Sequence, residues 1–384
     1  YQFDKDMYCK TFIQKHFKRL LKLTIFAILA TTFCYFYLIS QIGEFMKRST
    51  TFTSRYEPSE MIQVPDLFIC MKPGFKQSVA KKFQYPLSEL APFYDQKVSL
   101  NNQTSLWKTY LSLSFEYKVD FVIEVQEYKN TNTELKIESV TPIATYYRGM
   151  CYLVSMESQI HFSAYWVMKV SMTNSLNVSD VPNMLDVFFT SKESWYGLIT
   201  NDWPNKAELY LKPVQIDMQE PAILDIRISI KEIHFLKKDK YGTFEECLTN
   251  LFLNSNCEKI CFPGIFNFIE AIRTLPSCNY DEFYCLFNDM WSDKRKQLME
   301  CLKPGMALVY ETSVSKSLKG DKSNGSVTFG IFGASPMKKI EEEVYVISIP
   351  AFIGSIGGSL GLFFGFSFLA IFVDCIDRLK IQNK

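Results

Sequence analysis

The residues with the strongest potential for chemistry are six clustered cysteines. They are Cys247, Cys257, Cys261, Cys278, Cys285 and Cys301. Thiolates one helical turn apart, as at the second and third of these positions, can hold a metal ion. His234 is the only histidine near them, and an oxidising compartment favours disulfides. We therefore expect disulfides and no metal, in a pairing that the residues alone leave open. Cys70 and Cys151 lie upstream and are expected to pair with each other.

Enzymatic chemistry finds little support in the sequence. His16, His161 and His234 lie far apart, and we expect the last two on strand faces. The chain has no phosphate-binding glycine loop, no nucleophile elbow and no zinc-protease helix motif. Among the many carboxylates no pair stands out. We predict no enzymatic activity and no cofactor, and an ectoenzyme is the weakest alternative.

The charge balance excludes a simple electrostatic attraction to nucleic acid. The 384 residues carry 42 basic and 41 acidic side chains, a formal net charge of +1. A nucleic-acid-binding surface would need an excess of Lys and Arg. We expect no nucleic-acid partner.

Two apolar stretches predict membrane-spanning helices near the two ends of the chain. Residues 23–42 carry no charge, and residues 344–373 carry none over a still longer stretch. A helix of about 20 apolar residues spans a bilayer. In the second stretch, glycines four residues apart form a stripe that lets another helix approach closely. These glycines are Gly354, Gly357, Gly358, Gly361 and Gly365.

The flanking charges predict that both ends of the chain are cytoplasmic. Basic residues precede the first stretch and follow the second: Lys10, Lys15, Lys18, Arg19, Lys22, Arg378, Lys380 and Lys384. The segment between the stretches is then extracellular. It holds eight of the eleven cysteines and three glycosylation sequons, at Asn102, Asn177 and Asn324. The chain begins with Tyr1 instead of Met, so we expect further residues before it.

Hydrophobic periodicity divides the extracellular segment into strands and helices. Alternation predicts strands at residues 117–125, 166–172, 224–230 and 308–314, and residues 64–70 and 327–332 also have the pattern of strands. Apolar residues at helical spacing predict two amphipathic helices, over 244–252 and 283–291. The clustered cysteines lie on or beside these helices. We therefore expect a β-sheet domain with a disulfide-tied helical subdomain inserted between its strands.

Acidic residues stand at both ends of the second apolar stretch. Glu341, Glu342 and Glu343 precede it and Asp374 follows it. They can be solvated junctions, or, if several subunits bring them together, they can concentrate cations at the mouths of a pore.

Several motifs resemble the degenerin/epithelial sodium channel family, which includes acid-sensing channels. Residues 357–367 are similar to the GGxxGLFxGxS run in the second membrane helix of that family. Residues 64–70 resemble its FPAVTIC strand, and Gly149-Met150-Cys151-Tyr152 its GxCYTF motif. The cysteine-rich region that ends at Cys301-Leu302-Lys303-Pro304 resembles its thumb. The matches fall in the family's order and extend from the first apolar stretch to the last.

The resemblance implies a trimeric membrane protein of the α+β class. Two transmembrane helices would flank a large disulfide-rich β-sheet ectodomain with a helical thumb. It also implies nested thumb disulfides, Cys247–Cys301, Cys257–Cys285 and Cys261–Cys278, with Cys70–Cys151 upstream. Gly365, Phe366 and Ser367 would form the selectivity filter, where an interrupted helix exposes carbonyls to the ion. Gly361 and Asp374 would line the pore below the outer vestibule formed by Glu341 to Glu343.

The chain departs from the family pattern at several positions. Phe366 stands where the family has a small filter residue, and Val373, followed by Asp374, where it has an acidic one. His16 is followed by Phe17 instead of glycine. Gly305 stands where the family has a further thumb cysteine.

The predicted domain boundaries follow from these features. A cytoplasmic segment (1–19) precedes the first transmembrane helix (20–42) and an extracellular domain (43–343). That domain comprises the palm, finger and β-ball (about 56–240), the thumb (about 241–305) and return strands (about 306–340). A pore-lining helix (344–373) and a cytoplasmic segment (374–384) complete the chain.

The function that we predict is that of a subunit of a trimeric cation channel in the plasma membrane. By the resemblance it would pass Na⁺, be blocked by amiloride, and open to an extracellular ligand, such as a proton or a peptide, or to a mechanical tether. Its partners would be membrane lipid and the other subunits of a homo- or hetero-trimer. The main alternative is a non-conducting receptor, adhesion protein or accessory subunit, which Phe366 motivates. An ATP-gated two-pass trimer shares the topology and the cysteines but lacks this glycine-rich helix as a hallmark.

Overall fold

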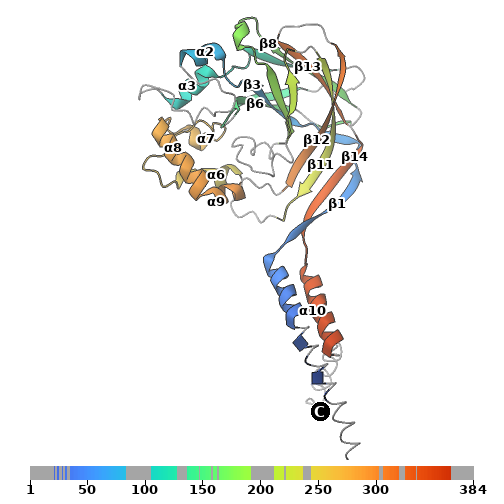
Figure 1. Ribbon diagram of the computed structural model, residues 1–384. Coiled ribbons are helices and arrows are strands. Elements are labelled where there is room, and N and C mark those ends of the chain that lie inside the picture. Colours follow the sequence, from blue (N-terminus) through green and yellow to red (C-terminus); the bar gives the residue numbers. More distant parts are fainter. Residues whose placement is uncertain are drawn as a thin grey trace, which may run out of the picture. The chain divides into compact units, whose positions relative to one another are not determined.

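The computed structural model (Figure 1) describes residues 21, 24–25, 28, 31–32, 35–83, 105–127, 136–146, 148–156, 159–161, 164–191, 212–219, 222–236, 244–301, 306–319, 325–333 and 335–364. Its contacts divide the chain into two compact units. One comprises residues 1–53 and 343–384, and the other comprises residues 54–342. In the described residues, the first unit is mainly helical and the second is built from β-sheets and a helical region.

A seven-stranded sheet forms one half of the larger unit. Its order is β1 (Thr50–Pro58), β14 (Met337–Tyr345), β11 (Ala222–His234), β13 (Ser326–Gly333), β8 (Tyr165–Met172) and β4 (Phe121–Glu127), and β12 (Met306–Lys319) pairs with β11. The central strand β11 runs antiparallel to β12 and parallel to both β13 and β14. Leu224, Ile226 and Ile228 of β11 are buried, as the alternation predicts.

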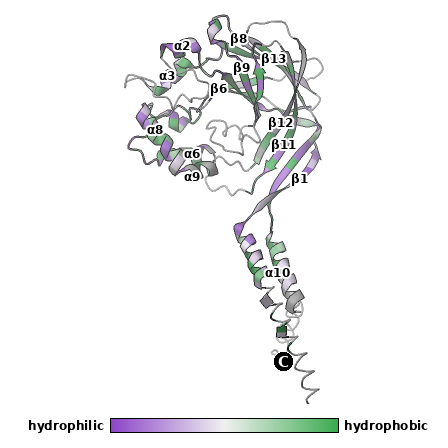
Figure 2. Ribbon diagram, in the orientation of Figure 1, coloured by the Kyte–Doolittle hydropathy of each residue, from purple (hydrophilic) through white to green (hydrophobic). Residues whose placement is uncertain are grey.

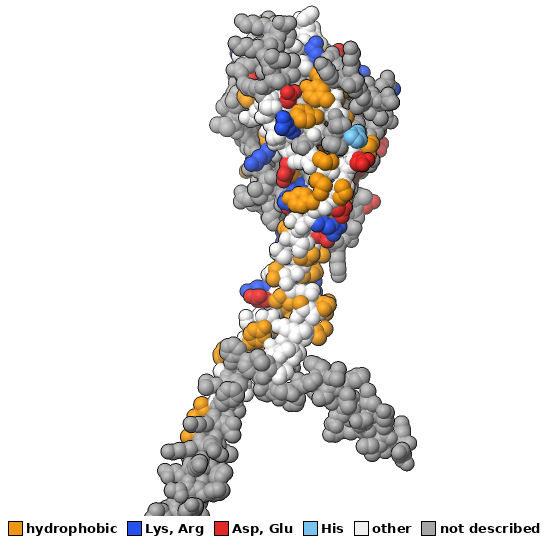
Figure 3. Space-filling view, turned by 90° about the vertical axis from the view of Figure 1, so that its right-hand side faces the viewer, with side chains coloured by type: hydrophobic (Ala, Val, Ile, Leu, Met, Phe, Trp, Pro, Cys, Tyr) orange, Lys and Arg blue, Asp and Glu red, His pale blue; other side chains and the backbone are white. Residues whose placement is uncertain are grey.

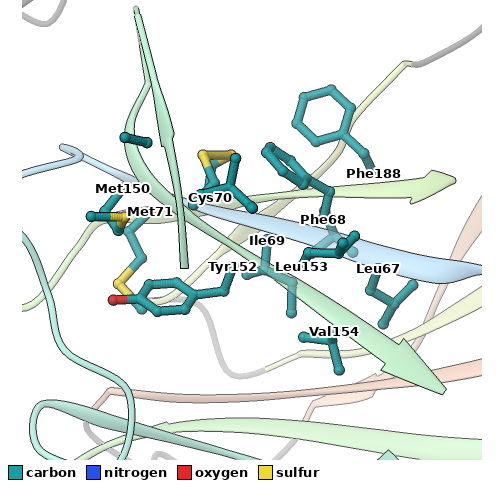
Figure 4. Close-up of a cluster of buried hydrophobic side chains, with 14 of the residues drawn as sticks. Leu67, Phe68, Ile69, Cys70, Met71, Met150, Tyr152, Leu153, Val154 and Phe188 are labelled. Carbon is teal, nitrogen blue, oxygen red and sulfur yellow. A yellow bond between two sulfur atoms is a disulfide. The ribbon is translucent and has the colours of Figure 1, made fainter. Parts of the chain in front are cut away.

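The other half is a five-stranded antiparallel sheet with a continuous apolar centre. Its order is β10 (Val214–Asp217), β9 (Met184–Thr190), β3 (Asp66–Lys72), β6 (Gly149–Met156) and β5 (Ile137–Thr145). The central strands β3 and β6 bury side chains on both faces, and Figure 4 shows this cluster around the Cys70–Cys151 disulfide. Burying each large apolar side chain contributes about 1.5–3 kcal/mol. A short pair, β2 (Met61–Gln63) with β7 (Gln159–His161), completes the β structure described.

The start of β6 requires glycine for two separate reasons. Gly149 has a φ of 79°, in the left-handed region that L side chains rarely adopt. A Cβ built on Gly149 would also lie 2.8 Å from the carbonyl oxygen of Gly74. A Cβ on Gly74 would lie 2.2 Å from the carbonyl oxygen of Arg148. The two glycines therefore allow two backbone segments to cross beside the disulfide.

The helical region follows β11 in the sequence. It contains α6 (Phe244–Leu253), α7 (Glu270–Arg273), α8 (Tyr280–Asn288), the π-helix η3 (Asp289–Asp293) and α9 (Arg295–Cys301). Asn279 caps α8 by accepting a hydrogen bond from the Glu282 N–H, while the Glu282 carboxylate accepts one from the Asn279 N–H. Phe283 and Leu286 of α8 and Leu248 and Phe252 of α6 are buried, which confirms the two predicted apolar stripes.

Two short helices pack beside the sheets, α2 (Gln77–Lys82) and α3 (Leu106–Leu113), with the 3-10 turn η2 (Val178–Asp180) beside α2. Ser105 caps α3 by accepting a hydrogen bond from the Lys108 N–H. The buried Asp180 accepts hydrogen bonds from the N–H and the hydroxyl of Ser78. These contacts hold η2 against the start of α2.

The smaller unit contains two helical segments. The described residues from 21 to 47 are helical, and α10 extends from Ile349 to Phe364. The described residues contain no helix that combines the length and the apolar character needed to cross a membrane. Helical structure continues to Lys47, beyond the predicted boundary at residue 42. At the other end, Val344 and Tyr345 belong to β14, so the helix begins five residues later than the predicted boundary at residue 344.

One predicted strand needs correction, and one observed strand was not predicted. Residues 117–119 form a turn before β4, with Lys118 at a φ of 69° and Val119 exposed, so the strand begins at Phe121. Residues 47–60 have no hydrophobic alternation, yet most of them form β1 at the edge of the sheet. Figure 2 shows β1 as largely hydrophilic, in contrast to the hydrophobic strands β6 and β9.

Candidate functional site

Strand β14 connects the larger sheet with α10 along the chain, and it carries the predicted vestibule residues. It pairs in parallel with the end of β11, where Lys231 lies opposite Lys339 and Ile233 opposite Glu341. Strand β14 ends at Tyr345 and α10 begins at Ile349, with three residues between them.

The acidic triplet is part of this strand instead of a junction after it. The Glu341 carboxylate accepts from Lys231 Nζ at 2.8 Å and from Lys339 Nζ at 2.7 Å. Glu342 pairs with Arg55 at 2.7 Å, and Glu343 accepts a hydrogen bond from the Thr50 hydroxyl at 2.5 Å. On the face drawn in Figure 3, acidic and basic side chains are interspersed. Within one chain Glu341 and Glu342 are thus paired with cations and Glu343 with a hydroxyl, and the place of the triplet at a vestibule stays a prediction.

A second charged cluster surrounds Glu232 on the same pair of strands. One carboxylate oxygen accepts from Lys338 Nζ at 2.6 Å, and the other lies 2.6 Å from Nε2 of His234. Burial alone would raise the pKa of Glu232, but the hydrogen bonds from Lys338 and His234 outweigh it and lower that pKa. The pKa of Glu341 is lowered in the same way, against the effect of burial, by Lys231 and Lys339. His234 is thus a strand residue, as predicted, with a carboxylate partner.

We expect the β11–β14 strand pair to lose stability in acid. Because both glutamates have folded pKa values below the ordinary 4.5, their contribution is present above that pH. It is lost as the pH falls from 4.5 toward the folded values. Replacing Glu341 by Gln should cost about 1.5–3 kcal/mol at pH 7, the range for hydrogen bonds to charged groups. Thermal unfolding of the purified chain between pH 7 and 3 should show a smaller acid-induced loss in Glu341→Gln than in the wild type. An equal loss in both would contradict the assignment.

Four disulfides join eight cysteines in the described residues. Cys247–Cys301, Cys257–Cys285 and Cys261–Cys278 tie the helical region, and Cys70–Cys151 joins β3 to β6. This is the pairing that the family resemblance implies. The three bridges are nested: Cys247–Cys301 joins α6 to α9, Cys257–Cys285 joins the residues after α6 to α8, and Cys261–Cys278 lies between these two helices in the sequence. They fix the helical region as one body.

The sequence analysis missed the polar centre of this helical region. Asp289, 5% exposed, lies on η3 and accepts hydrogen bonds from Asn256 Nδ2 at 2.9 Å and Lys294 Nζ at 2.9 Å. Burial would raise its pKa, but Lys294, Ser255 and Asn256 together lower it. Lys294 Nζ also donates to the carbonyl of Asn254. This cluster joins the end of α6 to the α8–α9 connection. In the sequence, Asp289 is an ordinary acidic residue after an amphipathic helix, and nothing nearby indicates that it is the centre of a buried polar cluster.

The helical region is also attached to the five-stranded sheet. Asn267 Nδ2 donates to the carbonyl of Pro142 at 2.7 Å, and its Oδ1 accepts from the N–H of Ala144 at 3.1 Å. Nearby, the rings of Tyr146 and Phe287 stack with centroids 4.6 Å apart. These contacts join the thumb to β5, and the sequence analysis predicted none of them.

Comparison with known proteins relates part of the chain to one family of channels. Residues 231–372, from the middle of β11 to the apolar stretch beyond α10, match the family model described as amiloride-sensitive sodium channel. Over these residues the chain is similar to this family. No match is found among curated proteins. Among solved structures, a cryo-EM structure of a proton-activated chloride channel matches at 8% identity, over 94% of this chain and 98% of that one, with a TM-score of 0.35. A score this low transfers no property from that channel to this chain.

The amiloride-sensitive sodium channel family, which this segment resembles, consists of membrane ion channels with a large extracellular domain, and its members are not enzymes. In the described residues of this chain, no cluster of three His, Cys, Asp or Glu side chains is placed to hold a metal ion. His161 ends β7 and is exposed.

Most of the predicted filter and inner pore residues lie outside the described residues. Gly365, Phe366, Ser367 and Asp374 do so, and their filter and pore roles stay predictions. Gly361 lies on α10 and is partly buried. Cβ atoms built on Gly354 and Gly358 would meet nothing within 4 Å. The glycine stripe is thus open in the single chain over these two positions.

Of the three sequons, only that of Asn177 lies in described residues. Asn102 and Asn324 lie outside them. Asn177, Val178 and Ser179 are all exposed at η2, with Val178 92% exposed. An exposed Asn-Val-Ser in an oxidising compartment is open to the glycosylation machinery.

We expect Asn177 to carry an N-linked glycan. Peptide-N-glycosidase treatment of the wild-type chain from secreting or surface-expressing cells should lower its apparent mass. In Asn177→Gln this drop should be smaller by the mass of one glycan. Ser179→Ala should reduce the drop by the same amount, because it destroys the sequon and keeps the asparagine. Val178→Ala preserves the sequon and is the matched control. If the glycosidase lowers the mass of the wild type and of Asn177→Gln by the same amount, the assignment is contradicted.

Proposed function

We propose that the chain is a subunit of a trimeric, sodium-type cation channel in the plasma membrane, gated by an extracellular stimulus through its ectodomain. The supporting observation is the family match over residues 231–372. That segment contains the disulfide-tied helices, the return strands β12 to β14 and α10. In this proposal both termini are cytoplasmic, and the segment between the two helical stretches is extracellular.

The mechanism that we propose runs from the helical region through the sheet to α10. The thumb is a stiff body because three disulfides and the Asp289 cluster tie its helices. The chain leaves it at Cys301 and re-enters the sheet as β12, which pairs along the whole length of β11. Because β11 also pairs with β14, a force on the thumb would reach the strand that continues into α10. At the filter, Gly365 and Ser367 would present backbone and hydroxyl oxygens to the ion.

The experiment that tests this proposal is electrical recording from cells that express the chain alone and with related subunits. We expect a current whose reversal potential follows the sodium gradient and not the chloride gradient, with block by amiloride. Candidate stimuli are acidification, peptides and membrane stretch. A reversal potential that follows chloride would overturn cation selectivity. Subunit counting by single-molecule photobleaching should give three.

A second candidate is a non-conducting or accessory subunit that keeps the fold. Phe366, in place of a small filter residue, favours it, because three phenyl rings at a narrow belt would obstruct an ion. Silence of the chain expressed alone, with a current appearing in Phe366→Ala or Phe366→Ser, would support this candidate. Normal surface labelling must accompany the silence, since an unfolded or retained chain is also silent.

A further inference from the structure

A hydroxyl pair joins the two helical segments of the smaller unit. Tyr37 lies in the helical residues before β1, and its hydroxyl oxygen lies 3.2 Å from Oγ of Ser355 on α10. The two residues are 318 positions apart in the sequence. The sequence analysis gave neither residue a role, since both lie inside apolar stretches.

Other contacts bring the same two segments together closer to the sheet. The rings of Phe45 and Phe352 stack with centroids 4.2 Å apart and planes 11° apart. The N–H of Val346 donates to the carbonyl of Ser49 at 3.0 Å. These contacts fix the spacing of the two segments at one end. The Tyr37–Ser355 pair lies further along them and adds a directional contact.

The hydroxyl pair also fixes which face of α10 meets the first segment. Phe352, Ser355 and Ser359 follow one another at spacings of three and four residues, so they share one face of the helix. Ser359, 9% exposed, donates its hydroxyl to the carbonyl of Ser355. Gly354 and Gly358 are exposed, with nothing within 4 Å of their Cβ positions. Rotating α10 about its axis would break the hydroxyl pair and turn the glycines.

We propose that Tyr37 is a positioning residue for α10, and that its hydroxyl contact with Ser355 sets the rotation of this helix and hence the equilibrium between closed and conducting states. The inference rests on the proposed function for its effect on current, but the contact itself can be tested without current. In a bilayer, a hydroxyl that loses its partner across the helix pair finds no water to replace it. Breaking the pair therefore has a free-energy cost. Measured interhelical side-chain hydrogen bonds in membranes correspond to about a 3- to 15-fold change in an equilibrium.

The contact is tested by cross-linking in the full-length chain. Tyr37→Cys and Ser355→Cys are combined in a chain whose cysteines at 9, 34 and 375 are changed to serine. A protease site is placed between Cys151 and Cys247. Because Cys70–Cys151 lies before that point and the thumb disulfides lie after it, no native disulfide joins the two fragments.

A short bifunctional thiol reagent applied to membranes should then keep the fragments together after cleavage. The matched control is Tyr35→Cys with Ser355→Cys. Tyr35 lies two residues away, is 62% exposed, and its hydroxyl has no described partner. Efficient linkage of the 37–355 pair with little linkage of the 35–355 pair supports the proposal. Equal or absent linkage of the 37–355 pair, with normal surface expression, overturns it.

The effect on current is tested with a double-mutant cycle. Tyr37→Phe and Ser355→Ala should each shift the closed-to-conducting ratio about 3- to 15-fold in the same direction, and the double variant should shift it no further than either one. Tyr35→Phe should leave it unchanged. Additive shifts overturn the proposal. A chain that cross-links as expected but conducts in no subunit combination counts against the proposed function, while the helix contact stands.

Discussion

Replacing Gly149 by alanine should destabilise the chain by about 2–5 kcal/mol, one of the largest effects of a single methyl group in the described structure. The left-handed backbone of Gly149 costs an L residue about 1–2 kcal/mol. The new Cβ would also press on the backbone of Gly74, with its carbonyl oxygen at 2.8 Å and its Cα at 3.1 Å. Backbone atoms cannot rotate away as a flexible side chain can, so overpacking adds about 1–3 kcal/mol.

Gly325 offers a matched control for Gly149→Ala. It has nearly the same φ, 77°, but the atom nearest its Cβ position is the Cβ of Met172 at 3.2 Å. Gly325→Ala should therefore cost mainly the backbone term, about 1–2 kcal/mol. Thermal unfolding of the purified full chain measures both variants. Equal losses in the two would mean that the close crossing with Gly74 contributes nothing.

Removing the Cys70–Cys151 disulfide, by changing both cysteines to alanine, should cost about 4.5 kcal/mol. The bridge spans 81 residues of sequence, and a larger closed loop restricts the unfolded chain more. The Cys261–Cys278 bridge spans 17 residues, for which the same relation gives about 3 kcal/mol. Both sulfur pairs are buried, so each double alanine also leaves a small apolar void.

Denaturant unfolding of the two double-alanine variants provides the comparison. The order of the losses is the test, because loop length is the main difference between the two bridges. A larger loss for Cys261→Ala with Cys278→Ala would contradict the loop-length argument. It would show that the helical region depends on its bridges more than the sheet core does. Retained glycosylation and surface delivery distinguish a destabilised chain from one that never folds.

The parts of the fold that could be predicted are those with a hydrophobic period. The helices α6 and α8 and the strands β8 and β11 each bury one face, and a buried face leaves its period in the sequence. Strand β1 leaves none, because its residues are almost all exposed and it is held by backbone pairing with β14. Strand β14 looks like a charged junction in the sequence because the cations that pair with Glu341 and Glu342 include Lys231 on β11 and Arg55 on β1, both far away in the chain. Pairing between strands distant in sequence has no local signal.

The disulfide pairing was predictable because family motifs cover it, whereas contacts between partners distant in the chain were not. The filter residues come from the same resemblance and stay a prediction. Tyr37 with Ser355, and Asn267 with β5, join residues more than a hundred positions apart. Each is an ordinary residue type in an ordinary local sequence. Only the folded chain brings such partners together.

The two hydrogen bonds of Asn267 have a consequence for the larger unit as a whole. Strand β5 is the last strand of its sheet, and the outward backbone groups of an end strand form a template on which a strand of another protein can assemble. The Asn267 amide occupies the carbonyl of Pro142 and the N–H of Ala144 with the donor and acceptor that an incoming strand would supply. Pro142 itself has no N–H to offer. The thumb thus closes the sheet against strand exchange and against fibrous aggregation, a protection that lasts as long as the thumb stays docked.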